Sequence, residues 1–204
     1  EVGVGGRIRL LKNIAGLWLL QECRRAWARE GSEYSYDELA RLAAEAQPFK
    51  TVISPDAFLS PGGMPARIAA YCRLSGQAVP ETVGEFARTI LESLALRYRQ
   101  VLESLESVTG SEIKVIHIVG GGSRNRLLNQ FAADATGRLV VAGPAEATAA
   151  GNVLGQALGA GDLRSLEEAR SLVRRSLAPE LVEPRGGIAA WDDAYGRFLR
   201  LPQG

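Results

Sequence analysis

Apolar residues recur at helical spacing along most of the chain and are interrupted by a few short β-branched runs. The longest periodic stretch places apolar residues at steps of three and four from Val83 to Val108, which predicts a helix over 82–108. At a rise of 1.5 Å per residue this helix is roughly 40 Å long, so it must cross most of a domain. Further helices are predicted over 13–28, 38–46, 65–72, 124–136, 146–158, 166–176 and 188–199.

Two β-branched runs, 113–119 and 139–141, are predicted strands. The first run is nearly continuous, as is typical of a strand covered on both faces, so its histidine, His117, is interpreted as a structural core residue. A third run, 51–53, precedes a turn-rich segment. The order strand, helix, strand, helix predicts an α/β domain with helices on both faces of the sheet.

Residues outside these elements are predicted to form loops. The tail between the last two helices is rich in Pro and Gly and is predicted to be irregular, whereas residues 7–11 alternate like the end of a strand.

Composition limits the classes of protein that the chain can belong to. With 204 residues, of which 46% are apolar and 23% charged, it can bury a core of good size. The 24 basic and 23 acidic residues leave a net charge of +1, which argues against a nucleic-acid partner. No apolar run approaches the ~18–20 residues that span a bilayer, so no membrane association is expected.

Two features of the sequence bear on its cellular setting. Cys23 and Cys72 are far apart, form neither a metal-spaced pair nor a disulfide framework, and indicate a reducing, cytoplasmic environment. The chain begins at Glu1 and its single Met is Met64, so we expect a processed chain or an excised piece.

Three consecutive glycines, Gly120, Gly121 and Gly122, separate the strand 113–119 from the helix 124–136. A helix N-terminus carries free N–H groups that favour an anion or a nucleotide, and glycine lets a ligand approach those groups closely. The stretch matches neither G-x-G-x-x-G nor G-x-x-x-x-G-K-[ST]. From spacing alone, a nucleotide site and a tight turn without a ligand are equally well supported, with Ser123 or Asn125 as the helix cap or a ligand contact.

The predicted helix 146–158 is rich in small residues and follows the next strand. Small side chains allow a helix to pack very close to a sheet. This closeness has two interpretations: it serves packing alone, which is the commoner case, or it lets the two strand–helix junctions together frame an adenosine pocket.

The helix predicted over 13–28 has an apolar stripe of Ile14, Leu17 and Trp18, and the next position of this stripe is the polar residue Gln21. A buried amide without partners is costly, so Gln21 is either a core amide with hydrogen-bond partners or a residue that faces a ligand. From the residues alone, the core amide is the better supported interpretation. Asn13 lies on the same predicted helix, roughly 12 Å away along its axis.

Several motifs occur in one order along nearly the whole chain. They are RLLKNIAGLWLLQECR at 9–24, HIVGGGSRN at 117–125, ADATG at 133–137 and GP-x-EAT at 143–148. In these motifs the chain resembles the C-terminal half of the FGGY carbohydrate kinases. The resemblance identifies residues 1–204 as the C-terminal domain of such a kinase, truncated at its N-terminal edge.

The resemblance implies a ribonuclease-H-like, actin-like ATPase lobe with a mixed sheet, from which the N-terminal strands are missing. It implies that Gly120, Gly121 and Gly122 approach ATP, that Gln21 contacts ATP, and that Asn13 contacts the sugar. With this resemblance, a ligand-facing Gln21 becomes the preferred interpretation. Within the family the motifs are most like those of members that phosphorylate the C1 hydroxyl of L-rhamnulose to L-rhamnulose 1-phosphate, with ATP and Mg²⁺ as cofactors.

The family's general base, an Asp, is expected upstream of Glu1 together with a phosphate-contacting loop. No catalytic residue and no metal ligand are therefore predicted in this chain, and Asp56 and Asp134 are not assigned as bases. The partners implied are ATP or ADP, the sugar in the intact enzyme, and a missing N-terminal kinase lobe, without which the chain is expected to be inactive. The segment 55–58, where a longer acidic loop is usual, and Val2, where glycine is usual, depart from the family pattern.

Other functions stay open at this point. The sugar can instead be L-fuculose, xylulose, gluconate or glycerol, because the missing lobe largely sets this choice. Two further alternatives are a non-catalytic, actin-like nucleotide-binding module and a packing domain without a ligand.

Overall fold

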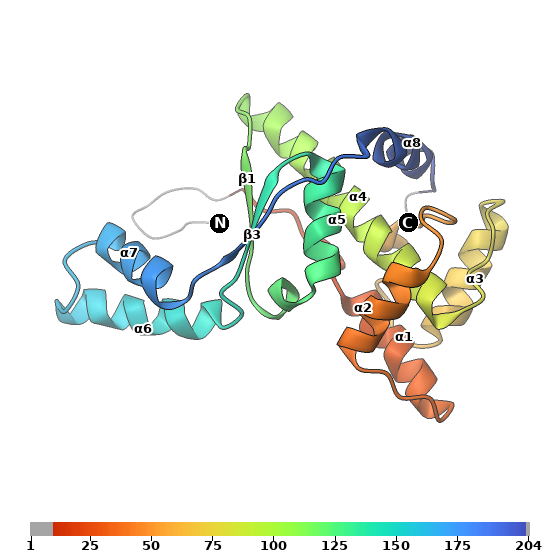
Figure 1. The fold of residues 1–204 in the computed structure, drawn as a ribbon, viewed down its shortest axis with the longest axis horizontal. Coiled ribbons are helices and arrows are strands. Elements are labelled where there is room, and N and C mark those ends of the chain that lie inside the picture. The colour runs from red at the N-terminus through yellow and green to blue at the C-terminus, as the bar shows by residue number, and fades with distance from the viewer. Residues whose placement is uncertain (1–9, 203–204) are drawn as a thin grey trace.

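A computed structural model of the chain describes residues 10–202 (Figure 1). Val2 and most of the alternating segment 7–11 therefore lie outside the described residues. The elements in chain order are α1 (Trp18–Arg29), α2 (Tyr36–Glu45), the 3₁₀ turn η2 (Pro55–Phe58), α3 (Met64–Leu74), α4 (Val83–Thr109), β1 (Val115–Ile118), the 3₁₀ turn η3 (Gly121–Arg124), α5 (Arg126–Thr136), β2 (Leu139–Ala142), α6 (Ala147–Ala160), α7 (Leu166–Ser176), β3 (Glu180–Val182) and α8 (Ile188–Leu199).

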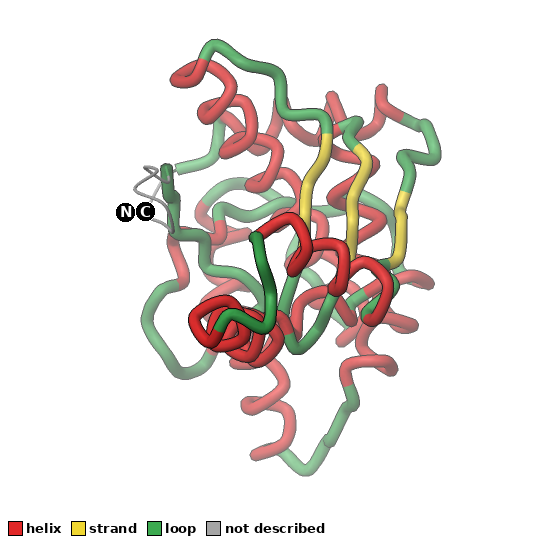
Figure 2. Tube along the Cα trace, turned by 90° about the vertical axis from the view of Figure 1, so that its left-hand side faces the viewer, coloured by secondary structure: helices red, strands yellow, loops and turns green. Residues whose placement is uncertain are grey.

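The three strands form one mixed sheet in the order β1-β2-β3, and Figure 2 shows them side by side. β1 and β2 are parallel with His117 opposite Val141, and β2 and β3 are antiparallel with Val141 opposite Leu181. β3 was not predicted, because it lies within the expected Pro- and Gly-rich loop. Among the described residues β1 has a strand neighbour on one side only, so its other edge is unpaired.

The long helix α4 confirms the prediction for 82–108 and forms the centre of the molecule (Figure 1). The Thr82 hydroxyl accepts a hydrogen bond from the Glu85 N–H at 3.2 Å, and Gly110 ends the helix in the left-handed conformation. The predicted apolar stripe is only partly right, since Val108 is exposed. In the middle of α4 nearly every residue is buried, because α2, α5, α8, η2 and α1 pack around it.

Helix α1 begins at Trp18, later than predicted. Gly16 adopts a positive φ of 53° just before it, a conformation that does not continue a right-handed helix. The buried face consists of Leu19, Leu20, Cys23 and Trp27, not of the stripe predicted from Ile14, Leu17 and Trp18. Asn13 therefore precedes the helix that carries Gln21, and the prediction that one helix holds both residues is wrong.

The β-branched run 51–53 is buried but is not a strand. Side chains satisfy its backbone in place of a neighbouring strand. The Gln77 amide donates to the Val52 carbonyl at 2.8 Å and accepts from the Val52 N–H at 3.1 Å, while Ser93 accepts from the Ile53 N–H at 2.9 Å. A hydrophobic run with these partners stays extended without joining a sheet.

The two sides of the sheet are covered differently. α5 packs on one side, against Ile116 and Val140, through Ala132 and Ala133. α6 and α7 lie on the other side (Figure 1), yet α6 buries no side chain, so the close packing predicted for its small residues is wrong. His117 is exposed because it points to this open side, which corrects its assignment to the core.

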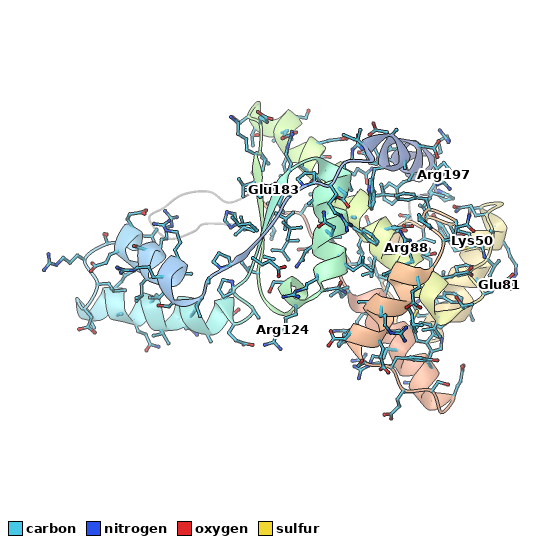
Figure 3. The ribbon with its side chains drawn as sticks, in the orientation of Figure 1. Lys50, Glu81, Arg88, Arg124, Glu183 and Arg197 are labelled. Atoms are coloured by element: carbon cyan, nitrogen blue, oxygen red, sulfur yellow. The ribbon has the colours of Figure 1, made fainter. Side chains whose placement is uncertain are left out.

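A buried ion pair on α4 connects this helix to the end of α2 and to the turn that follows it. Arg88 donates to Glu92 at 2.7 Å and to the last carbonyls of α2, and Figure 3 shows it between the helices. Glu92 also accepts from the N–H of Phe49, a residue with φ of 52°, and Arg197 donates to the Phe49 carbonyl. These contacts hold Phe49 in a conformation that a non-glycine residue seldom adopts.

The variant Glu92→Gln is expected to remove one component of the pH dependence of stability. Burial raises the pKa of Glu92 from its ordinary 4.5 to about 6. Between these values the folded chain binds the proton more tightly than the unfolded chain, so the free energy of unfolding falls as the pH rises from 4.5 to 6. Glutamine does not titrate, so the stability of the variant relative to the parent should rise by roughly 1–2 kcal/mol across this range.

Urea unfolding at several pH values measures this difference. Glu45→Gln, which alters an exposed carboxylate paired with Arg41, is the control and should leave the difference from the parent almost constant. A Glu92→Gln difference that is equally constant between pH 4.5 and 6.5 would contradict the prediction.

Candidate functional site

The glycine segment lies where β1 turns into η3 and α5. Gly120 has φ of 76° and ψ of −164°, a combination that is open essentially to glycine alone. Its carbonyl accepts two hydrogen bonds, from the Ser123 N–H at 3.0 Å and from the Ser123 hydroxyl at 2.7 Å. The glycine is therefore required for the path of the chain, independently of any ligand.

The next two glycines present their backbone to open space. A Cβ built on Gly121 or on Gly122 has no atom within 4 Å. Within the described residues neither amide has a hydrogen-bond acceptor, since η3 begins at Gly121. Two adjacent free N–H groups without side-chain cover form a suitable site for an anion such as a phosphate group.

Helix α5 begins directly after this turn. Of the two residues considered as its cap, Ser123 and Asn125, it is Asn125 that caps the helix, because the Asn125 side chain accepts from the Leu128 N–H at 2.9 Å. The α5 N-terminus, with the positive end of its dipole, therefore lies beside the free amides of Gly121 and Gly122.

The second strand–helix junction is hydrogen-bonded to the first. After β2 the chain passes through Gly143 and a cis Pro144 into α6. The Gly143 N–H donates to the Ile118 carbonyl at 2.8 Å, and the Gly120 N–H donates to the Pro144 carbonyl at 3.0 Å. The ends of two parallel strands thus form one edge, which is the location where open α/β sheets bind ligands.

An exposed ion pair bridges the same edge. Arg124 in η3 and Glu146, which precedes α6, are 3.1 Å apart, and Figure 3 shows Arg124 at the end of the sheet where the glycine turn lies. Both side chains are largely solvated, so the pair adds little stability, but it keeps the Arg124 guanidinium at the edge where the two strand–helix junctions meet. Sequence reasoning missed this residue, because its position depends on how the two junctions meet.

Gln21 lies on a half-buried flank of α1, and its side chain has no hydrogen-bond partner in the described part of the chain. The interpretation of Gln21 as a satisfied core amide is therefore not supported. Asn13 is exposed and precedes α1. Neither side chain is hydrogen-bonded to Gly120, Gly121 or Gly122, because α1 packs against α3 and α4.

The two carboxylates that the sequence analysis considered as bases are held by arginines. Asp134 on α5 accepts from the N–H and the guanidinium of Arg185 at 2.8 and 3.2 Å, which ties α5 to the segment after β3. Asp56 pairs with Arg97 at 2.6 Å. Both carboxylates therefore connect separate parts of the fold.

Both cysteines are buried, and the described residues contain no cluster of metal ligands. Burial raises the pKa of the Cys23 thiol to about 12 and that of Cys72 to about 11, so neither forms a reactive thiolate at neutral pH. Between residues 10 and 202 no group of three or more His, Cys, Asp or Glu side chains is placed to hold a metal ion. In the same range, no helix has the length and apolar character needed to cross a bilayer.

A mixed sheet with a glycine turn and two helix N-termini at one edge is the arrangement at which α/β domains commonly bind phosphate groups. Residues 1–160 match the C-terminal domain of the FGGY family of carbohydrate kinases, and the chain belongs to this family. The chain is 50% identical over 200 residues to a rhamnulokinase of Bacteroides thetaiotaomicron. The aligned region covers 97% of this chain and 40% of that protein. A rhamnulokinase of Enterococcus faecalis is 42% identical over 204 residues, and this aligned region covers 98% of this chain and 41% of that protein.

Solved structures of sugar kinases share the fold. Xylulose kinase from Rhodospirillum rubrum superposes with a TM-score of 0.65 at 22% identity, over 90% of this chain and 37% of that one. Plasmodium falciparum glycerol kinase with ADP superposes with a TM-score of 0.61 at 19% identity. The superposition covers 90% of this chain and 35% of that one. The chain thus has the actin-like, ribonuclease-H-like fold predicted from its sequence, and it spans about two fifths of the length of the curated relatives.

Proposed function

We propose that this chain is the ATP-binding part of a kinase that transfers the γ-phosphoryl group of ATP to L-rhamnulose, giving L-rhamnulose 1-phosphate. The observation that carries the proposal is the pair of amides at Gly121 and Gly122. They have no acceptor among the described residues, and the space beside their Cα atoms is open, at the edge shared by two strand–helix junctions. The names of the curated relatives support the choice of sugar.

In this proposal each part of the site has a limited role. The N–H groups of Gly121 and Gly122 and the start of α5 hold phosphate oxygens, and the conformation of Gly120 aims those groups. Gln21 is proposed to contact ATP and Asn13 the sugar. Phosphoryl transfer is mainly a matter of positioning and charge stabilisation, and this chain supplies the nucleotide side of it.

The sugar side and the proton acceptor are assigned to an N-terminal lobe. Asp56 and Asp134 are engaged by arginines, and the proposal assigns the base to a residue outside residues 10–202. Kinases of this kind use Mg²⁺ with ATP, but the described residues provide no ligand set for the ion, so the role proposed for this chain is confined to the nucleotide itself. The unpaired, buried cysteines fit a cytoplasmic reaction.

Calorimetry with ADP tests the nucleotide site directly. The chain is expected to bind ADP, and Gly121→Val should weaken binding at least tenfold, because the valine side chain enters the space that the phosphates need. Folding should be little affected, since a Cβ at this position meets no atom.

Gly159→Val is the matched control, because Gly159 lies in the exposed helix α6 and its Cβ also meets no atom. ADP affinity should survive in this variant. Absence of ADP binding by the parent, or equal affinity in the parent and Gly121→Val, would support a tight turn without a ligand.

A further inference from the structure

Asn129 is a fully buried polar residue on α5, directly behind the glycine turn. Its side-chain N–H group donates to the Ser123 carbonyl at 2.8 Å. Its side-chain oxygen has no hydrogen-bond partner in the described part of the chain. A carbonyl can only accept a hydrogen bond, so the amide must keep its nitrogen toward Ser123.

Ser123 passes this restraint on to the glycine turn. The Ser123 N–H and hydroxyl both donate to the Gly120 carbonyl, and the Gly120 N–H donates to the Pro144 carbonyl. A continuous series of hydrogen bonds therefore runs from Asn129 through Ser123 and Gly120 to the second strand–helix junction.

The Asn129 side chain supplies a hydrogen bond that the backbone does not provide. The chain changes from η3 to α5 at Asn125, and the Asn129 N–H donates to the Asn125 carbonyl. Among the described residues, it is the Asn129 side chain that donates to the Ser123 carbonyl, which lies in a largely buried residue. A buried carbonyl without a donor is unfavourable, so loss of this amide should allow the turn to rearrange.

We propose that Asn129 is a positioning residue for the nucleotide site: its side-chain amide fixes Ser123, and through Ser123 it keeps the N–H groups of Gly121 and Gly122 directed outward. This inference rests on the proposed function, since it assigns the purpose of the restraint to nucleotide binding. Asn129 itself makes no contact with the nucleotide in this proposal.

The variant Asn129→Asp tests the proposal through its pH profile. A carboxylate at this position would face the Ser123 carbonyl, and both groups can only accept hydrogen bonds. A protonated carboxyl group, in contrast, can donate to the carbonyl as the amide does. ADP affinity in Asn129→Asp should be at least tenfold weaker than in the parent at pH 8. It should recover to within about threefold of the parent at pH 5.5, where burial keeps the carboxyl protonated.

Gln130→Glu is the matched control, because it makes the same chemical change one residue further along α5. The Gln130 amide donates to Asp134 and to the Glu183 carbonyl, so this variant disturbs a different segment. It should lose stability but keep the ADP affinity of the parent. Equal losses of affinity in both variants, or parent-like affinity of folded Asn129→Asp at pH 8, would overturn the proposal.

Two further measurements also test the proposal. Ser123→Ala, which removes one bond to Gly120 and leaves α5 intact, should weaken ADP binding at least threefold; unchanged affinity counts against the proposal. Amide hydrogen exchange at Ser123 and Asn125 should be at least tenfold faster in Asn129→Asp than in the parent at pH 8, and unchanged exchange likewise counts against it. If the parent binds no ADP, the proposed function fails, and the exchange result still decides whether Asn129 holds the turn.

Discussion

Gly84→Ala is expected to destabilise the chain by roughly 3 kcal/mol, near the upper end of the range for overpacked sites. A Cβ on Gly84 would lie 2.5 Å from the Leu42 carbonyl oxygen and 3.3 Å from the Leu42 Cβ. The obstacle is backbone, so a change of rotamer cannot relieve it, and α2 must move away from α4. That movement also disturbs Arg88, which binds the last carbonyls of α2.

Thermal unfolding measures this effect. For a chain of this length, 3 kcal/mol corresponds to a fall in Tm of roughly 6–12 °C. Gly159→Ala is the control, since its Cβ meets no atom on exposed α6, and it should be neutral or slightly stabilising. Parent-like stability of Gly84→Ala would show that α2 and α4 are not held as closely as described.

The second large effect concerns catalysis. The chain alone is expected to show no phosphorylation of L-rhamnulose above the rate in buffer with ATP and Mg²⁺. Asp56 and Asp134 are paired with arginines and neither is assigned as the base, and loss of a general base alone costs about 10²–10⁴ in rate. Loss of the surfaces that orient the sugar costs more.

A coupled assay for ADP formation tests this expectation. The informative comparison is a chimera that joins this chain to the upstream part of the Bacteroides thetaiotaomicron rhamnulokinase, to which it is 50% identical. The chimera should phosphorylate L-rhamnulose, and Gly121→Val in the chimera should reduce that activity. Measurable turnover by the 204-residue chain alone would refute the expectation.

Local signals account for the elements that the sequence predicts well. α7 and α8 have the predicted bounds, and Ser165 accepts from the Glu168 N–H to cap α7. α4 likewise follows from its periodicity and from Gly110. In each case the residues that start or end the helix lie within a few positions of it.

The features that the sequence left open or misplaced depend on distant residues or on backbone conformation. The run 51–53 has strand composition, but Gln77 and Ser93 satisfy its backbone from other parts of the chain. β3 has little strand signal and forms because β2 offers it an edge. The start of α1 depends on the positive φ of Gly16, which spacing does not reveal.

The candidate site divides in the same way. Gly120, Gly121 and Gly122 are found from sequence, because a strand, three glycines and a capped helix occur consecutively. Asn129 is missed, since a lone Asn among the apolar residues of α5 acquires its meaning only when the Ser123 carbonyl is seen beside it. The one signal available was a polar residue between Leu128 and Phe131, both of which are buried.

The open arm formed by α6 and α7 has a consequence for how the chain unfolds. α6 buries no side chain and α7 buries only Ala169, so the arm removes little apolar surface from water. α4, in contrast, is buried along its middle by five other elements. The molecule is therefore not uniformly cooperative: the arm can open and close as a local unit while α4 stays folded, and the stability measured for the whole chain belongs chiefly to the helical core.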